Sequence, residues 1–120
     1  MYGLKRILIG VLLTLPLLSY ASLIPFTEKN CPLLETPKTV LLVHATWCSH
    51  CRAFIRVYEN VSNLNKYKDW TFYQVIADDL DHICGIQIDG YPYTYKNNMK
   101  SVLRGNRSQR DLEYFLDQTK

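Results

Sequence analysis

The 120-residue sequence lacks an internal repeat, a low-complexity tract and a linker, which predicts a single domain. It also has little surplus of charge. The whole chain carries 14 basic and 11 acidic residues, but Lys5 and Arg6 lie in an N-terminal stretch that we expect to be removed, leaving 12 against 11. No basic patch remains that would favour nucleic acid or anionic lipid, so neither is expected as a partner.

A long apolar run occurs only near the N-terminus, over residues 7–18, after Lys5 and Arg6 and before the small-x-small triplet that ends at Ala21. We expect residues 1–21 to be a signal peptide and residues 22–120 to form an exported domain in the periplasm, outside the cell or in a secretory lumen. The alternative is an uncleaved anchor, with residues 7–21 holding the domain on a membrane. Residues 117–120 are not an endoplasmic-reticulum retention signal, which favours periplasm or secretion.

Cysteine is scarce, with four residues, and there is only one Cys-x-x-Cys. A zinc site would need a second pair of ligands at suitable spacing, so no metal is expected. An oxidising compartment permits two disulfides, and a bridge between Cys31 and Cys84 is one arrangement. Two free buried thiols, or an additional resolving cysteine, remain alternatives because four cysteines allow three pairings.

The one Cys-x-x-Cys, formed by Cys48 and Cys51, follows the apolar run 40–43 and precedes a segment with helical periodicity. Strand, paired thiol and helix in this order are typical of a redox centre. Unpaired N–H groups and the helix dipole at the start of a helix favour the thiolate of Cys48. Cys51, one turn later, can resolve a mixed disulfide. His50 between them can add positive charge or a hydrogen bond, and either would favour the thiolate and make the pair more oxidising.

Periodicity and turn residues predict the order of elements over the domain. Pro32 and Pro37 are expected to limit a helical turn that opens at Thr27. The predicted strands cover 22–26, 39–45, 70–77, 93–96 and 100–104, and the predicted helices cover 49–66, 78–84 and a segment after Ser108. This order predicts an α/β fold with a mixed sheet flanked by helices on both faces.

With this element order the chain resembles the thioredoxin superfamily, and most of all a single protein disulfide isomerase-like domain. The resemblance rests on residues 40–51, which end in Trp-Cys-Ser-His-Cys, on the Gly90-Tyr91-Pro92 turn and on residues 103–116. It implies a central mixed sheet, a cis-proline at Pro92 and a substrate surface formed by Trp47, Tyr91 and Pro92. Cys48 and Cys51 would be the catalytic pair, with no cofactor required.

The sequence departs from the pattern of that family at several positions. The family's buried acid six residues before the first cysteine is Leu42 here, and its usual lysine partner is Gln74. His44 occupies an aromatic position, and we favour a hydrogen-bonded core histidine over a proton relay. Ser49 replaces the usual glycine or proline and joins His50 as a residue expected to tune the redox potential. Tyr93 follows the proline, which makes the groove more aromatic.

These observations predict an exported thiol–disulfide oxidoreductase that acts on protein cysteines or disulfides and needs a redox partner to recycle it. Oxidation or isomerisation is favoured over reduction, although the direction of electron flow stays open. One alternative is a non-catalytic, chaperone-like module that binds polypeptides on the same fold. Another is a dedicated reductant or metallochaperone for a single partner.

Overall fold

The computed structural model describes residues 23–119. The signal peptide expected over residues 1–21 lies outside the described residues and stays a prediction. Within residues 23–119, none of the helices combines the length and apolarity that a membrane crossing requires.

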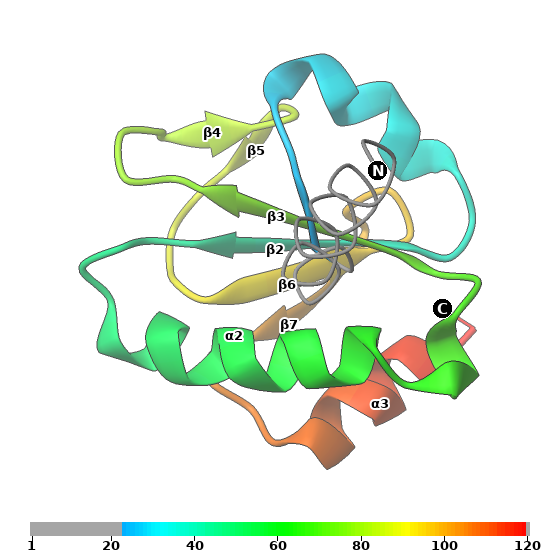
Figure 1. Ribbon diagram of the computed structural model, residues 1–120. Coiled ribbons are helices and arrows are strands. Elements are labelled where there is room, and N and C mark those ends of the chain that lie inside the picture. Colours follow the sequence, from blue (N-terminus) through cyan, green and yellow to red (C-terminus); the bar gives the residue numbers. More distant parts are fainter. Residues whose placement is uncertain (1–22, 120) are drawn as a thin grey trace, which may run out of the picture.

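Five strands form one mixed sheet, as the element order predicted (Figure 1). The order across the sheet is β1-β3-β2-β6-β7, with β1, β3 and β2 parallel and with β6 and β7 antiparallel to their neighbours. Their bounds are Leu23–Pro25 for β1, Thr39–His44 for β2, Thr71–Ile76 for β3, Tyr93–Lys96 for β6 and Ser101–Arg104 for β7. Every residue of the central strand β2 is buried, because the sheet is covered on both faces.

Two α-helices, α2 (Ser49–Ser62) and α3 (Gln109–Asp117), cover one face of the sheet (Figure 1). The core between them and the sheet consists of Val40, Leu42, Phe54, Tyr58, Val61, Tyr67, Phe72, Leu112, Phe115 and Leu116. Ser108 caps α3 by accepting a hydrogen bond from the Asp111 N–H, as expected. The helix predicted to continue to residue 66 ends at Ser62 instead. Leu64 has an extended backbone, and the short 3₁₀-helix η2 (Asn65–Tyr67) follows it.

The opposite face is covered by the 3₁₀-helix η1 (Glu28–Glu35) and by a small hairpin of β4 (His82–Ile83) and β5 (Ile86–Gln87) (Figure 1). The helical turn is therefore longer than expected, because Pro32 lies inside η1 rather than ending it. Helices do flank both faces of the sheet, but the second face has a 3₁₀-helix where the first has two α-helices.

The helix predicted over residues 78–84 is wrong, because the chain forms a loop and the β4–β5 hairpin there. Cys84 and Gly85 both have positive φ, 50° and 79°, which makes a two-residue hairpin turn and cannot continue a helix. The acidic start of this segment suggested the first turn of a helix. In the structure the Asp78 carboxylate instead accepts hydrogen bonds from Thr46, far away in the sequence.

Tyr58 fixes the position of α2 on the sheet. Its side chain is fully buried, and its hydroxyl donates to the carbonyl of Tyr73 at 2.6 Å, with the carbonyl of Val40 at 3.2 Å. Burial raises the pKa of Tyr58 well above its ordinary value, so the hydroxyl stays protonated and remains a donor. This contact holds α2, and with it the segment that begins at Cys48, against two neighbouring strands.

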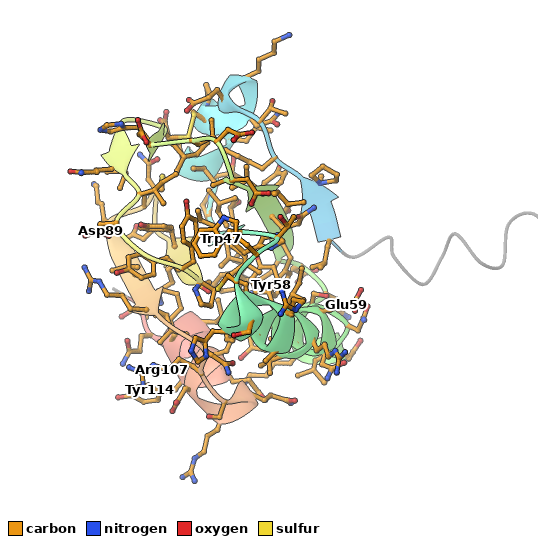
Figure 2. The ribbon with its side chains drawn as sticks, turned by 90° about the vertical axis from the view of Figure 1, so that its left-hand side faces the viewer. Trp47, Tyr58, Glu59, Asp89, Arg107 and Tyr114 are labelled. Carbon is orange, nitrogen blue, oxygen red and sulfur yellow. A yellow bond between two sulfur atoms is a disulfide. The ribbon has the colours of Figure 1, made fainter. Side chains whose placement is uncertain are left out.

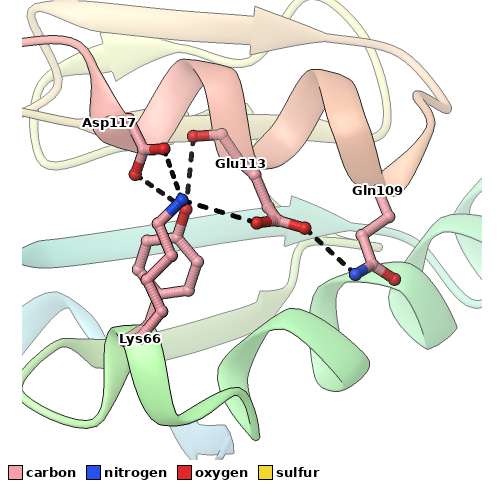
Figure 3. Close-up of polar contacts among 5 residues, drawn as sticks. Lys66, Gln109, Glu113 and Asp117 are labelled. Atoms are coloured by element: carbon pink, nitrogen blue, oxygen red, sulfur yellow. Dashed lines mark hydrogen bonds and ion pairs between the residues drawn. The ribbon is translucent and has the colours of Figure 1, made fainter.

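A polar network joins the end of η2 to α3 (Figure 3). Lys66 Nζ lies 2.7 Å from Asp117 and 3.6 Å from Glu113, and the hydroxyl of Tyr67 donates to Asp117 at 2.8 Å. Gln109 donates to the other side of Glu113 at 3.0 Å. Since the charges are largely exposed, the network orients the helix and contributes little stability.

Candidate redox site

The two cysteines of the Cys-x-x-Cys lie at the start of α2, directly after the carboxyl end of β2. Cys48 is the N-cap residue of α2, and its sulfur accepts a hydrogen bond from the Cys51 N–H at 3.2 Å. Figure 2 views the end of the molecule that faces left in Figure 1 and places Trp47 at its centre. The thiol pair therefore lies at one end of the sheet, beside an exposed aromatic ring.

The two thiols, which are not joined to one another here, differ in their access to solvent. Cys48 is 8% exposed and Cys51 only 1% exposed. Burial and the hydrogen bond with Cys48 raise the pKa of Cys51 to about 12, whereas the backbone N–H of Ala45 opposes this shift. Cys51 is therefore a protonated thiol at neutral pH, and Cys48 is the sulfur that a partner can reach.

Selective labelling tests this difference. In the reduced protein at pH 7–9, iodoacetamide should modify Cys48 and leave Cys51 unmodified, because only thiolates react and Cys51 holds its proton to about pH 12. Peptide mapping by mass spectrometry gives the site of labelling, and protein unfolded in urea provides the control in which both sulfurs react. Equal labelling of both residues in the folded protein would contradict the assignment.

The raised pKa of Cys51 also has a consequence for stability. A group whose pKa is higher in the folded state stabilises that state below its unfolded pKa. For Cys51 this contribution is present below about pH 9 and is lost as pH rises toward about 12. It concerns only the reduced protein, since a disulfide has no proton to lose.

The residues expected to form the substrate surface lie together at the thiol pair. The Tyr91–Pro92 peptide bond is cis, the conformation that the resemblance implied. Tyr91 packs against the cluster of Ala45, Cys48 and Cys51. The rings of Trp47 and Tyr91 meet edge to face, with centroids 5.3 Å apart, and Trp47 is 65% exposed. A wall of two aromatic rings therefore borders Cys48.

The polar residues beneath the site form a pair without a carboxylate. His44 is buried, and its Nε2 lies 2.7 Å from the Oε1 of Gln74, which supports a hydrogen-bonded core histidine. Leu42 is fully buried, and the register places it between Gln74 and Thr94 on the adjacent strands. Leu42 thus stands where the family pattern has an acid. Gln74, the hydrogen-bond partner of His44, stands where that pattern has a lysine.

His50 and Ser49 are both exposed in the first turn of α2. Neither side chain makes a hydrogen bond or an ion pair with residues 23–119. Their position beside Cys48 fits a tuning role through charge and solvation, and that role stays a prediction.

Cys31 and Cys84 form a disulfide with an S–S distance of 2.04 Å, so the pairing that the sequence left open is present. It ties η1 to the turn of the β4–β5 hairpin. Among the described residues, the grouping with metal-ligand spacing is Glu28 with these two cysteines, and both sulfurs are engaged in the disulfide. The Glu28 carboxylate also accepts a hydrogen bond from the Cys84 N–H at 3.3 Å.

Sequence reasoning missed two residues next to the site, Thr46 and Asp78. The Asp78 carboxylate accepts hydrogen bonds from the Thr46 N–H at 2.8 Å and from its hydroxyl at 2.5 Å. A usable signal existed, because β2 and β3 were expected to be parallel and their carboxyl ends then meet at one edge of the sheet. The residues that follow those two ends include Thr46 and Asp78.

A mixed sheet with a Cys-x-x-Cys at the start of a helix and a cis-proline beside it defines a thioredoxin-like domain. The chain belongs to the thioredoxin family, since the model of the family described as Thioredoxin matches residues 27–118. A curated relative, "Putative thioredoxin-5" of Dictyostelium discoideum, is 37% identical over 54 residues, 45% of this chain. That match spans about half the length of the relative, 51%.

Solved structures are similar at the level of the fold. A Malassezia sympodialis thioredoxin, Mala s 13, matches with a TM-score of 0.63 and 20% identity over 78% of this chain and 87% of that chain. Thioredoxin f from spinach chloroplast, long form, matches with a TM-score of 0.59 and 20% identity over 78% and 83%. At this identity they support the thioredoxin-like fold with its mixed sheet.

Proposed function

We propose that the protein is an exported thiol–disulfide oxidoreductase whose redox group is the Cys48–Cys51 pair. One observation carries the proposal: Cys48 caps α2 beside the Trp47–Tyr91 wall, while Cys51 lies buried one turn later. The export part rests on the N-terminal pattern of residues 1–21. Substrates are protein cysteines or disulfides, and a second redox protein recycles the pair.

In the reductive direction, the Cys48 thiolate attacks a substrate disulfide, forms a mixed disulfide and releases one substrate thiolate. Cys51 then loses its proton and attacks the Cys48 sulfur. The products are the Cys48–Cys51 disulfide and a second substrate thiolate, so two electrons pass from this protein to the substrate. The reverse sequence donates the disulfide to a substrate dithiol and reduces this protein.

The high pKa of Cys51 explains why the second attack needs a proton acceptor. No carboxylate is available from position 42, since Leu42 is apolar. The substrate thiolate released in the first step is itself a base close to the site. We propose that it, or water, accepts the proton of Cys51, with His44 held by Gln74 in a structural role.

We favour oxidation or isomerisation, because the charge that His50 can carry next to Cys48 stabilises the thiolate and hence the reduced form. Equilibration with glutathione should give a reduction potential of about −120 to −180 mV. His50→Ala should lower the potential by roughly 10 to 30 mV, whereas Arg56→Ala, an exposed change further along α2, should not.

Each outcome of that measurement has a separate meaning. A potential near about −270 mV would overturn the oxidising direction and indicate a reductant supplied by an upstream donor. A pair that does not equilibrate with glutathione would reject the redox function altogether.

A further inference from the structure

The segment that carries Trp47 and Cys48 is held by the residues that follow β3. Both oxygens of the Asp78 carboxylate accept hydrogen bonds from Thr46, one from its N–H and one from its hydroxyl. One residue earlier, the Ala77 N–H donates to the carbonyl of His44 at 2.8 Å. These bonds fix the path of the chain just before the reactive cysteine.

Ala77 also holds the other wall of the site. The Tyr91 hydroxyl donates to the carbonyl of Ala77 at 3.0 Å, which anchors the residue before the cis-proline. The ring of Tyr91 in turn meets the ring of Trp47 edge to face. Ala77 is therefore bonded to the end of β2 on one side and to the loop with Pro92 on the other, and Asp78 next to it is bonded to the loop before Cys48.

We propose that Asp78 is a positioning residue of the redox site, which orients the loop before Cys48 so that this sulfur and the Trp47–Tyr91 wall engage a protein disulfide together. This rests on the proposed function above. Asp78 acts through Thr46, and no contact with a reacting sulfur is needed. A misplacement of the loop by about 1 Å would be enough to slow the reaction strongly.

The ionised carboxylate suits this geometry. The hydroxyl and the N–H of Thr46 hold the pKa of Asp78 below its ordinary value, and His44 nearby adds to this. A carboxylate offers acceptors on both oxygens, as the two bonds require. An asparagine could accept from the Thr46 N–H and donate to the Thr46 hydroxyl, so it would keep the geometry without the charge.

Two hydrogen bonds that do not involve Asp78 also hold the loop before Cys48, so an effect of Asp78 on the position of the loop can be distinguished from an effect on folding. Arg52 Nη1 on α2 donates to the carbonyl of Thr46 at 3.0 Å, and the Cys48 N–H donates to the carbonyl of Ala45. Asp78 is exposed and lies outside the two main core clusters. Its removal should therefore loosen the loop while the sheet and α2 remain folded.

The test compares Asp78→Ala, Asp78→Asn and Asp79→Asn in the full chain. Asp79 is the matched control, an exposed carboxylate next in the sequence without a hydrogen bond or ion pair to residues 23–119. Two quantities are measured: kcat/KM with a protein disulfide and with a small aromatic disulfide, and the pH profile of Cys48 alkylation.

Asp78→Ala should lower kcat/KM for the protein disulfide roughly fivefold to tenfold, and less for the small disulfide. It should also change the pH profile of Cys48 alkylation, because a looser loop weakens the hydrogen bond that the Cys48 sulfur accepts from the Cys51 N–H. Asp78→Asn should keep kcat/KM within about twofold of the wild-type value and leave the alkylation profile unchanged. Asp79→Asn should match the wild type in both measurements. Thr46→Val, which removes only the hydroxyl, provides an intermediate case if Asp78→Ala does not fold.

Three results would overturn the proposal. The first is that Asp78→Ala behaves like Asp79→Asn. The second is that Asp78→Ala lowers the stability of the fold while the rates and the alkylation profile stay unchanged. The third is that Asp78→Asn lowers activity as much as Asp78→Ala, which would assign the effect to the charge of Asp78. A wild-type protein without turnover would instead reject the proposed function, and the alkylation profiles would still test the positioning of Cys48.

Discussion

Cys48→Ser should abolish thiol–disulfide turnover, with a loss of at least about a thousandfold in the rate of reduction of a protein disulfide. The physical reason is that no other described cysteine can substitute for it. Cys51 is enclosed and holds its proton at neutral pH, and Cys31 and Cys84 are bonded to each other. Removal of the accessible sulfur thus removes the nucleophile itself.

Cys51→Ser should have a different effect, which makes the pair of variants diagnostic. Cys48 would still attack, but no thiol would resolve the mixed disulfide, so covalent complexes with substrate should accumulate. They are detected as bands of higher mass that disappear on reduction. Tyr114→Phe, a change on the exposed surface of α3, is the control and should behave as the wild type.

Two outcomes would contradict this division of roles. Retention of turnover by Cys48→Ser would mean that another sulfur is the nucleophile. If no complex accumulates with Cys51→Ser, and if a Cys48→Ser/Cys51→Ser protein binds unfolded polypeptide as well as the wild type, the chaperone-like alternative would be favoured. The exposed Trp47–Tyr91 wall could serve such binding by itself.

Loss of the Cys31–Cys84 bridge should lower the free energy of unfolding by about 4 kcal/mol, since the bridge closes a loop between residues 53 apart in sequence. This is a large part of the stability of a domain of this size. The bridge also joins η1 to the β4–β5 hairpin, whose strands pair over only two residues each. These elements should open first in the variant.

The measurement needs a background in which only this bridge differs. Urea unfolding of a Cys48→Ala/Cys51→Ala protein should be compared with that of the protein in which all four cysteines are alanine. Turnover is absent from both, so the comparison does not depend on redox function. A difference below about 1 kcal/mol would show that the bridge adds little, contrary to the effect of closing a loop of this length.

Local sequence accounts for most of the sheet and for the position of the dithiol. The almost continuous apolar run predicts a buried strand over residues 39–45, where the structure has β2, and the type and place of Ser108 predict the cap of α3. Such signals depend on residues that are neighbours along the chain, so they can be recognised without knowledge of the fold.

The failure over residues 78–84 has the opposite cause. Three aspartates in this short segment fitted the first turn of a helix, yet the partner of Asp78 is Thr46, 32 residues earlier. Cys84 likewise bonds to Cys31 and adopts a positive φ in the hairpin turn. Contacts between distant residues outweigh a weak local preference for helix.

The sequence by itself determined the order of the five strands of the main sheet and of α2 and α3, the Cys-x-x-Cys at a helix start and the Gly-Tyr-Pro turn, because these follow from residue type and spacing. Only the tertiary structure decided which cysteines pair, which sulfur is buried, and that His44 binds Gln74. It also decided that the Asp78 carboxylate accepts hydrogen bonds from Thr46. The physical reason is that burial, pKa and hydrogen-bond partners depend on side chains that the fold brings together. The expected parallel strands indicate only which edge of the sheet two segments share, and not which of their side chains touch.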